Sequence, residues 1–154
     1  MKYKCLVLDH DDTVVNSTAT IHFPSFLAYL EKVRPGKTYT LEEYFRKNFD
    51  PGVVPFFSQE VGLTPAELDE EFHFWQAFVR ERIPKAYPGI REILQRHRAQ
   101  GGLIAVISHS VAAMIERDYR ENDLPMPDVI YGWDYPEHQR KPHPWPMDQL
   151  MRRY

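Results

Sequence analysis

The chain has little of several features that mark other classes of protein. It contains a single cysteine among 154 residues, so no disulfide can form within it, and a lone thiol in the apolar stretch at Cys5 favours a reducing, intracellular setting. No segment approaches the roughly 18 apolar residues of a membrane span, and the N-terminus turns acidic at Asp9, too soon for a signal peptide. We therefore expect a cytoplasmic protein with no membrane partner.

The chain also has little net charge. The formal net charge is -3 and the basic residues form no long run, which argues against a surface that grips a nucleic acid polymer or anionic lipid. What is present is the composition of a soluble globular protein, 43% hydrophobic and 27% charged, in a chain long enough to bury one core. The expected partner is a small molecule, and the oligomeric state stays open.

Two short apolar runs end abruptly at polar residues. Cys5–Leu8 stops at Asp9, and Leu103–Ile107 stops at Ser108. Continuous apolar runs of this length are typical of strands in a parallel sheet. A third candidate strand, residues 128–131, is weaker.

Helical periodicity precedes and follows the second of these runs. The apolar residues that recur at helical spacing are Ile90, Ile93 and Leu94 before it, and Val111, Met114, Ile115 and Tyr119 after it. Helix and strand thus alternate, which is the pattern of right-handed crossovers. The sequence predicts an α/β fold with a three-layer, doubly wound, Rossmann-like parallel sheet.

Residues 16–86 break this alternation. They contain several helical patterns separated by proline-containing breaks and no convincing strand. Thr64, followed three residues later by Glu67, predicts a capping box at the start of one helix. We expect an inserted α-helical cap over 16–86 and an α/β core formed by 1–15 and 87–154. Most of the many aromatic residues of the insertion are expected to form its own core, and a minority to close over a substrate.

Three carboxylates, Asp9, Asp11 and Asp12, lie within four residues at the end of the first predicted strand. They repel one another unless a cation or hydrogen-bond donors neutralise them. Mg²⁺ prefers hard oxygen ligands and is commonly bound by one or two carboxylates together with substrate phosphate. The cluster therefore indicates a magnesium site, with an Asx turn or a helix cap as the alternative.

Two further residues are expected at the same edge of the sheet. Ser108 ends the second predicted strand, where its hydroxyl and the N–H groups of the following helix would form an anion site; a plain helix cap is the alternative. Lys141 lies in a proline-stiffened loop after the third strand and could neutralise a carboxylate nucleophile and a phosphate, or be a surface lysine. Because ligands bind beyond the carboxyl ends of parallel strands, we expect Asp9, Asp11, Ser108 and Lys141 to converge.

The order of these segments resembles that of the haloacid dehalogenase superfamily. Asp9 to Thr13 matches the first motif of the family, D-x-D-x-T, Ser108 is similar to the serine or threonine of the second, and Lys141 resembles the lysine of the third. The Tyr87–Ile90 segment looks like the return from a helical cap, as in the phosphoglycolate phosphatase-like and β-phosphoglucomutase-like branches.

This resemblance implies a Mg²⁺-dependent phosphatase acting on a small phosphate monoester through an aspartyl-phosphate. Asp9 would be the nucleophile and Asp11 the general acid and base. Lys141 would be the third catalytic residue, and Asp9 and Asp11 the metal ligands. The second aspartate argues against a dehalogenase.

The resemblance also implies substrate-binding roles for Asp12, Thr13, Ser108 and His109. Asp12 replaces the glycine that is common in the motif. His22, near the start of the cap, would contact the substrate or assist proton transfer, with a packing or surface histidine as the alternative.

One part of the family pattern is missing. No acidic pair follows the third motif before Tyr154, so the remaining metal ligand has no counterpart, and Cys5–Leu8 would form an exposed apolar edge strand. We expect this sequence to be truncated relative to a longer parent that continues with a strand ending in an aspartate pair.

Several alternatives stay open. A sugar phosphomutase uses the same chemistry, and a binding or regulatory fragment without turnover becomes serious if Tyr154 is the true terminus. A signalling receiver domain is disfavoured by the long insertion and by Asp128, which lies at the wrong end of its strand. A zinc site formed by histidines lacks the expected ligand spacing.

Overall fold

The computed structural model describes residues 3–154, which form two compact units. The first comprises residues 3–16 and Pro84–Tyr154, and the second is Ser17–Ile83. The first unit is a parallel three-stranded sheet flanked by helices, so the predicted α/β, Rossmann-like fold class is confirmed. That the second unit serves as a cap stays a prediction.

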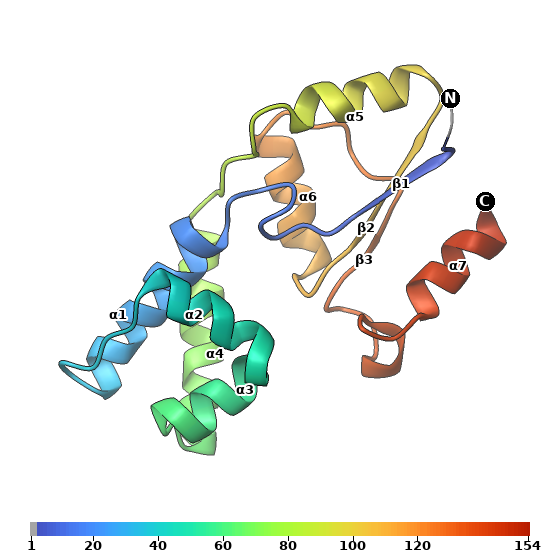
Figure 1. The fold of residues 1–154 in the computed structure, drawn as a ribbon. Coiled ribbons are helices and arrows are strands. Elements are labelled where there is room, and N and C mark those ends of the chain that lie inside the picture. Colours follow the sequence, from blue (N-terminus) through green and yellow to red (C-terminus); the bar gives the residue numbers. More distant parts are fainter. Residues whose placement is uncertain (1–2) are drawn as a thin grey trace. The chain divides into compact units, whose positions relative to one another are not determined.

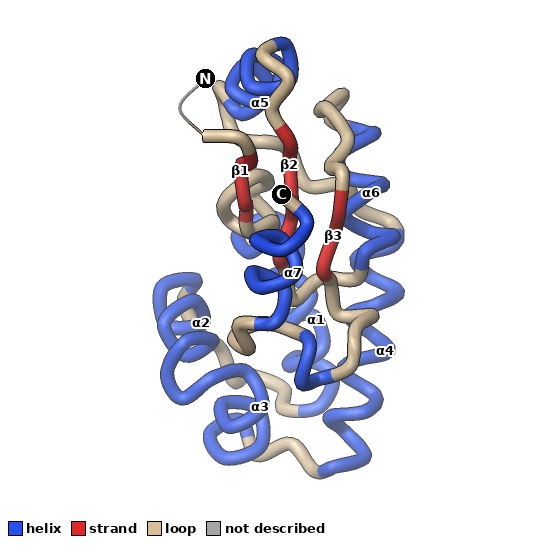
Figure 2. Tube along the Cα trace, turned by 90° about the vertical axis from the view of Figure 1, so that its right-hand side faces the viewer, coloured by secondary structure: helices blue, strands red, loops and turns tan. Residues whose placement is uncertain are grey.

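The sheet has the order β1-β2-β3, with both neighbouring pairs parallel (Figure 2). Its strands are β1 (Cys5–Leu8), β2 (Leu103–Ile107) and β3 (Val129–Tyr131). The first two have the bounds expected from sequence, and the third begins one residue later than expected. As expected, β1 lies at an edge of the sheet, and its Val7 is 39% exposed. The carboxyl ends of all three strands lie at one edge, where the polar segments follow them.

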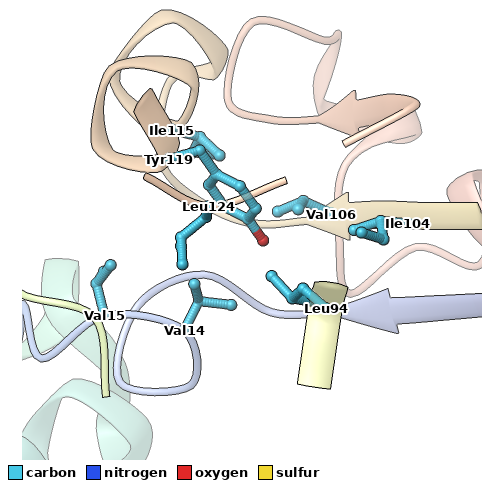
Figure 3. Packing of buried hydrophobic residues seen from close by; sticks show 8 residues of the cluster. All are labelled: Val14, Val15, Leu94, Ile104, Val106, Ile115, Tyr119 and Leu124. Carbon is cyan, nitrogen blue, oxygen red and sulfur yellow. The ribbon is translucent and has the colours of Figure 1, made fainter. Parts of the chain in front are cut away.

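Helices cover both faces of this sheet (Figure 1). One core cluster, shown in Figure 3, joins β2 to α5 and α6 on one face, and the other joins β2 and β3 to α7 on the opposite face. The helices of the first unit are α5 (Ile90–Ala99), α6 (Ala112–Glu121), the 3₁₀ turn η4 (Glu137–Gln139) and α7 (Trp145–Arg153). Ile104 and Val106 are fully buried on the first face and Ala105 on the second, which follows from the alternation of side chains along a strand.

The two segments that lead into and out of the second unit are paired within the first. Val15 and Ala86 form an antiparallel bridge, and the N–H of Asn16 donates to the carbonyl of Lys85 at 2.9 Å. The Asn122 amide, at the end of α6, accepts from the N–H of Ala86 at 2.8 Å. The two connections are therefore paired with each other by backbone hydrogen bonds and tied to α6 by the side chain of Asn122.

The second unit contains no strand among residues 17–83. Its elements are the short π-helical segments η1 (Thr18–His22), η2 (Asn48–Gly52) and η3 (Phe56–Val61), and the helices α1 (Phe23–Val33), α2 (Leu41–Lys47), α3 (Val53–Pro55) and α4 (Pro65–Arg80). The predicted capping box is present, because the Thr64 hydroxyl accepts from the N–H of Glu67 and the Glu67 carboxylate accepts from the N–H of Thr64.

Aromatic side chains form most of the core of the second unit. The buried ones are Phe26, Tyr29, Tyr44, Phe56 and Phe57. Phe45, Phe49 and Phe72 lie outside this core and are exposed, which agrees with the expectation that most, and not all, of the aromatic residues form it. None of the helices in residues 3–154 is both long and apolar enough to cross a lipid bilayer.

Candidate active site

The loop after β1 is a tight turn built around the backbone of His10. Its carbonyl accepts from the N–H groups of Val14 at 2.9 Å and Val15 at 3.2 Å, while the N–H of Asp12 donates to the carbonyl of Val15 at 2.8 Å. Asp12 has a φ of 56°, a left-handed conformation that aspartate tolerates better than most residues. The backbone of the D-x-D-x-T segment is thereby fixed at the end of the strand.

The side chain of His10 points into the fold. It is 1% exposed, its Nε2 lies 3.1 Å from Oδ2 of Asp118 on α6, and its ring stacks on Tyr119. Asp118 also accepts from the guanidinium of Arg117 at 2.7 Å. His10 therefore anchors the loop to α6. The residues on either side of it, Asp9 and Asp11, lie at the edge of the sheet where β1 ends.

Asp9 is paired with the lysine of the third motif. The Nζ of Lys141 donates to Oδ1 of Asp9 at 2.7 Å, and the same oxygen accepts from the N–H of His10 at 2.8 Å. The loop that carries Lys141 is held by His109, whose Nε2 lies 2.8 Å from the Lys141 carbonyl oxygen. Because a carbonyl can only accept, Nε2 carries the proton in this contact. Asp9 remains 44% exposed, which leaves it accessible to a ligand.

Asp11 is held by two serines at the carboxyl end of β2. Its Oδ2 accepts from the hydroxyl of Ser110 at 2.6 Å and lies 3.5 Å from that of Ser108. Both serines are buried. The structure thus joins Asp9 to Lys141 and Asp11 to Ser108, four positions that were expected to converge. Ser110 was missed, and the one signal in the sequence is its place two residues after the serine that ends the strand.

The oxygen atoms of Asp9 and Asp11 suit a magnesium ion. They are hard donors, and Mg²⁺ is commonly held by one or two carboxylates with water and substrate phosphate completing its coordination. Within residues 3–154, no group of three or more His, Cys, Asp or Glu side chains is arranged to hold a metal ion. The carboxylates of the D-x-D-x-T segment are the kind of ligand that Mg²⁺ uses when it shares its coordination with a substrate phosphate.

The other predicted site residues lie in the loop after β1 or in the second unit. Asp12 lies in the turn described above, and its charge adds to the effect of burial in raising the pKa of Tyr87. Thr13 is exposed on the same loop. His22 belongs to the second unit, where its Nδ1 accepts from the indole N–H of Trp75 at 3.0 Å. Substrate-binding roles for these residues stay predictions.

Asp128 has a structural place at the opposite end of the sheet. It precedes β3, and its carboxylate accepts from the N–H of Ile104 at 2.8 Å and from the guanidinium of Arg98 at 2.6 Å. Burial opposes these contacts, yet together they hold the pKa of the Asp128 carboxyl below its usual range. A phosphoryl-accepting aspartate of a receiver domain would lie at the other end, so this residue does not support that alternative.

Comparison with known proteins agrees with the motifs. The family model of haloacid dehalogenase-like hydrolases matches residues 6–154. The chain is similar to a predicted haloacid dehalogenase-like hydrolase from Bacteroides fragilis, with 22% identity and a TM-score of 0.78 over 99% of this chain and 73% of that one. It is similar to a predicted phosphoglycolate phosphatase from Haemophilus somnus 129PT, with 21% identity and a TM-score of 0.76 over 99% and 72%. A third similar structure is CbbY from Rhodobacter sphaeroides in complex with phosphate, with 20% identity and a TM-score of 0.69 over 97% and 71%.

No curated protein matches the chain. At the identities above, the solved structures establish a shared fold, and this chain spans between 71% and 73% of their lengths. The family model, in contrast, covers nearly the whole sequence, including the segments that carry Asp9, Ser108 and Lys141. The chain therefore belongs to the haloacid dehalogenase-like hydrolases, as the order of its motifs predicted.

Proposed function

We propose that this protein is a Mg²⁺-dependent phosphatase that hydrolyses a small phosphate monoester through an aspartyl-phosphate on Asp9. The observation that carries the proposal is the 2.7 Å contact between Nζ of Lys141 and Oδ1 of Asp9. Asp9 lies on the same loop as Asp11, which accepts a hydrogen bond from the hydroxyl of Ser110. Two carboxylates and a lysine at the carboxyl ends of parallel strands are suited to binding and transferring a phosphoryl group.

The reaction would proceed in two steps. A carboxylate oxygen of Asp9 attacks phosphorus as the bond to the leaving oxygen breaks, and that oxygen takes a proton from Asp11. Asp11 then removes a proton from water, whose oxygen attacks phosphorus and releases Asp9 and inorganic phosphate. Lys141 neutralises charge on Asp9 and on the phosphoryl oxygens. Mg²⁺ held by a carboxylate oxygen of Asp9 and by an oxygen of Asp11 that is not used for proton transfer would supply further neutralisation of the phosphoryl group.

Substrate recognition would involve residues around this centre. Ser108 is suited to a phosphate oxygen, whereas the N–H of Ala112 at the start of α6 already donates to a carboxylate oxygen of Asp134 at 2.7 Å. Asp12, Thr13 and His109 would line the same edge of the sheet. The structure of CbbY with phosphate, and another with xylulose-(1,5)-bisphosphate, support a small phosphorylated ligand for this fold. A cytoplasmic location is part of the same proposal, since the chain carries one thiol and no disulfide.

The test is hydrolysis of p-nitrophenyl phosphate with Mg²⁺, followed by removal of the metal with EDTA. We expect wild type to release inorganic phosphate, EDTA to abolish the release, and Asp9→Asn to lower the rate by at least about a thousandfold, since it removes the nucleophile. Asp69→Asn, on exposed α4, is the matched control and should hydrolyse at the wild-type rate. Equal rates for wild type and Asp9→Asn would exclude the mechanism, whereas isomerisation of a sugar phosphate with little phosphate release would indicate a mutase.

A further inference from the structure

Ser110 is held at each of its polar groups. Its N–H donates to the hydroxyl oxygen of Ser108 at 3.0 Å, and its carbonyl accepts from the N–H of Trp133 at 3.0 Å. Its hydroxyl donates to Oδ2 of Asp11 at 2.6 Å, and the residue is 9% exposed. A buried hydroxyl on a backbone fixed from both sides has little freedom to turn away from its acceptor.

The neighbouring loop is shaped to allow this arrangement. A Cβ atom on Gly132, which follows β3, would lie 2.6 Å from the carbonyl oxygen of Ser110. Backbone atoms cannot give way as the end of a flexible side chain can, so only glycine lets the loop after β3 approach this closely. The approach is what lets Trp133 bind the Ser110 carbonyl.

The hydroxyls of Ser108 and Ser110 both contact the same carboxylate oxygen of Asp11. The hydroxyl of Ser110 donates to Oδ2 at 2.6 Å, and that of Ser108 lies 3.5 Å from the same atom. Because Ser108 already accepts from the N–H of Ser110, its own proton is directed to another acceptor. An oxygen that accepts from two hydroxyls does not carry the acid proton, so Oδ1 is the atom at which Asp11 would exchange it.

We infer that Ser110 is a positioning residue for Asp11, fixing the carboxyl rotation so that Oδ1 exchanges the proton with the leaving oxygen and with water. This inference rests on the proposed phosphatase function. In the first step the Asp9–phosphorus bond forms, the bond from phosphorus to the leaving oxygen breaks, and Oδ1 of Asp11 gives that oxygen its proton. In the second step Oδ1 takes a proton from the attacking water as the Asp9–phosphorus bond breaks.

A comparison of two substrates that differ in their need for that proton tests the inference. Phenyl phosphate and p-nitrophenyl phosphate have similar shapes, but the phenolate leaving group is far more basic and depends more on protonation. We expect Ser110→Ala to lower kcat/KM for phenyl phosphate about ten- to a hundredfold more than for p-nitrophenyl phosphate, since general acid catalysis contributes about 10²–10⁴. Ser110→Thr, which keeps a hydroxyl, should restore most of the loss. Ser58→Ala, which removes a serine hydroxyl from the second unit, should leave kcat/KM for both substrates unchanged.

The possible outcomes separate the inference from the proposed function. Equal losses on both substrates, or no loss on either, would overturn the role of Ser110 while leaving the phosphatase proposal in place. If Ser110→Ala unfolds, Ser110→Thr still decides, because a folded variant with a hydroxyl must keep the wild-type ratio between the two substrates. A wild-type protein that hydrolyses neither phosphate ester with Mg²⁺ would overturn the proposed function, and this inference with it.

Discussion

The ammonium group of Lys141 lies 2.7 Å from Oδ1 of Asp9, across a separation of 132 positions in the sequence. The contact exists because β1 ends at Leu8 and the loop carrying Lys141 follows β3, at the same edge of the sheet. His109 holds that loop through the Lys141 carbonyl. A cation fixed against the proposed nucleophile reduces the repulsion that an incoming phosphate dianion would meet.

Lys141→Met should therefore impair catalysis more than folding. The substitution keeps most of the apolar stem and removes the charge, so we expect kcat/KM for p-nitrophenyl phosphate to fall by about 10²–10³, as when one transition-state donor is lost. Lys85→Met, at an exposed position, is the control. A variant of Lys141 with wild-type kcat/KM would contradict the role given to this lysine.

The buried contact between His10 and Asp118 should contribute to stability. His10→Leu leaves the Asp118 carboxylate, 5% exposed, without one of its partners. We expect the free energy of unfolding in urea to fall by about 1–3 kcal/mol. His73→Leu removes the exposed pair with Asp69 at 3.8 Å and should change stability by less than about 0.5 kcal/mol. Equal effects of the two substitutions would show that His10 does not anchor the loop.

Gly132→Ala should disturb both stability and activity. The new methyl group would meet the carbonyl oxygen of Ser110 at 2.6 Å, and forcing the backbone apart is expected to cost about 1–3 kcal/mol. Displacement of Ser110 should also lower kcat/KM for phenyl phosphate. Gly36→Ala, where the added carbon meets nothing within 4 Å but φ is +79°, should lose stability through backbone strain alone. If Gly132→Ala hydrolysed phenyl phosphate with the wild-type kcat/KM, Gly132 would not be needed to place Ser110 for catalysis.

Glu71 on α4 should make stability depend on pH. Burial raises the pKa of its carboxyl from 4.5 to about 7, so between these values the folded protein binds more protons than the unfolded chain. Its contribution to stability is complete below pH 4.5 and is lost as the pH rises through 7. Glu71→Gln should thus gain up to about 3 kcal/mol relative to wild type between pH 4.5 and 8. Thermal unfolding of wild type and Glu71→Gln at pH 4.5 and pH 8 measures this gain, with Glu92→Gln, at an exposed position, as the control. A stability difference between Glu71→Gln and wild type that does not change with pH would refute the prediction.

Local sequence was enough to place several elements. The apolar runs at Cys5–Leu8 and Leu103–Ile107 have no helical spacing and end at polar residues, and both are strands with those bounds. The capping box at Thr64 is also present, because it depends only on residues three positions apart. The third strand was expected one residue too early, since Asp128 uses its side chain, as well as its backbone, to bond to Ile104.

Other features depended on contacts that periodicity does not describe. Most aromatic residues of the second unit were expected in its core, but the sequence did not show that Phe49 would be one of the exposed ones, at 76%. Helical spacing alone does not say which helix faces meet. Ser110 gave almost no signal in the sequence, since its contacts are with Asp11 and with the loop at Gly132, which follow two other strands.

The sequence by itself determined the family, the class of fold and the residue types at the site, because each strand-end motif is a short segment whose chemistry is local. Only the tertiary structure decided which atoms meet: Lys141 with Asp9, Ser110 with Asp11, and His10 with Asp118. These pairings follow from parallel strand order and from close backbone approach at Gly132. Both arise from packing between segments far apart in the chain, which no local pattern specifies.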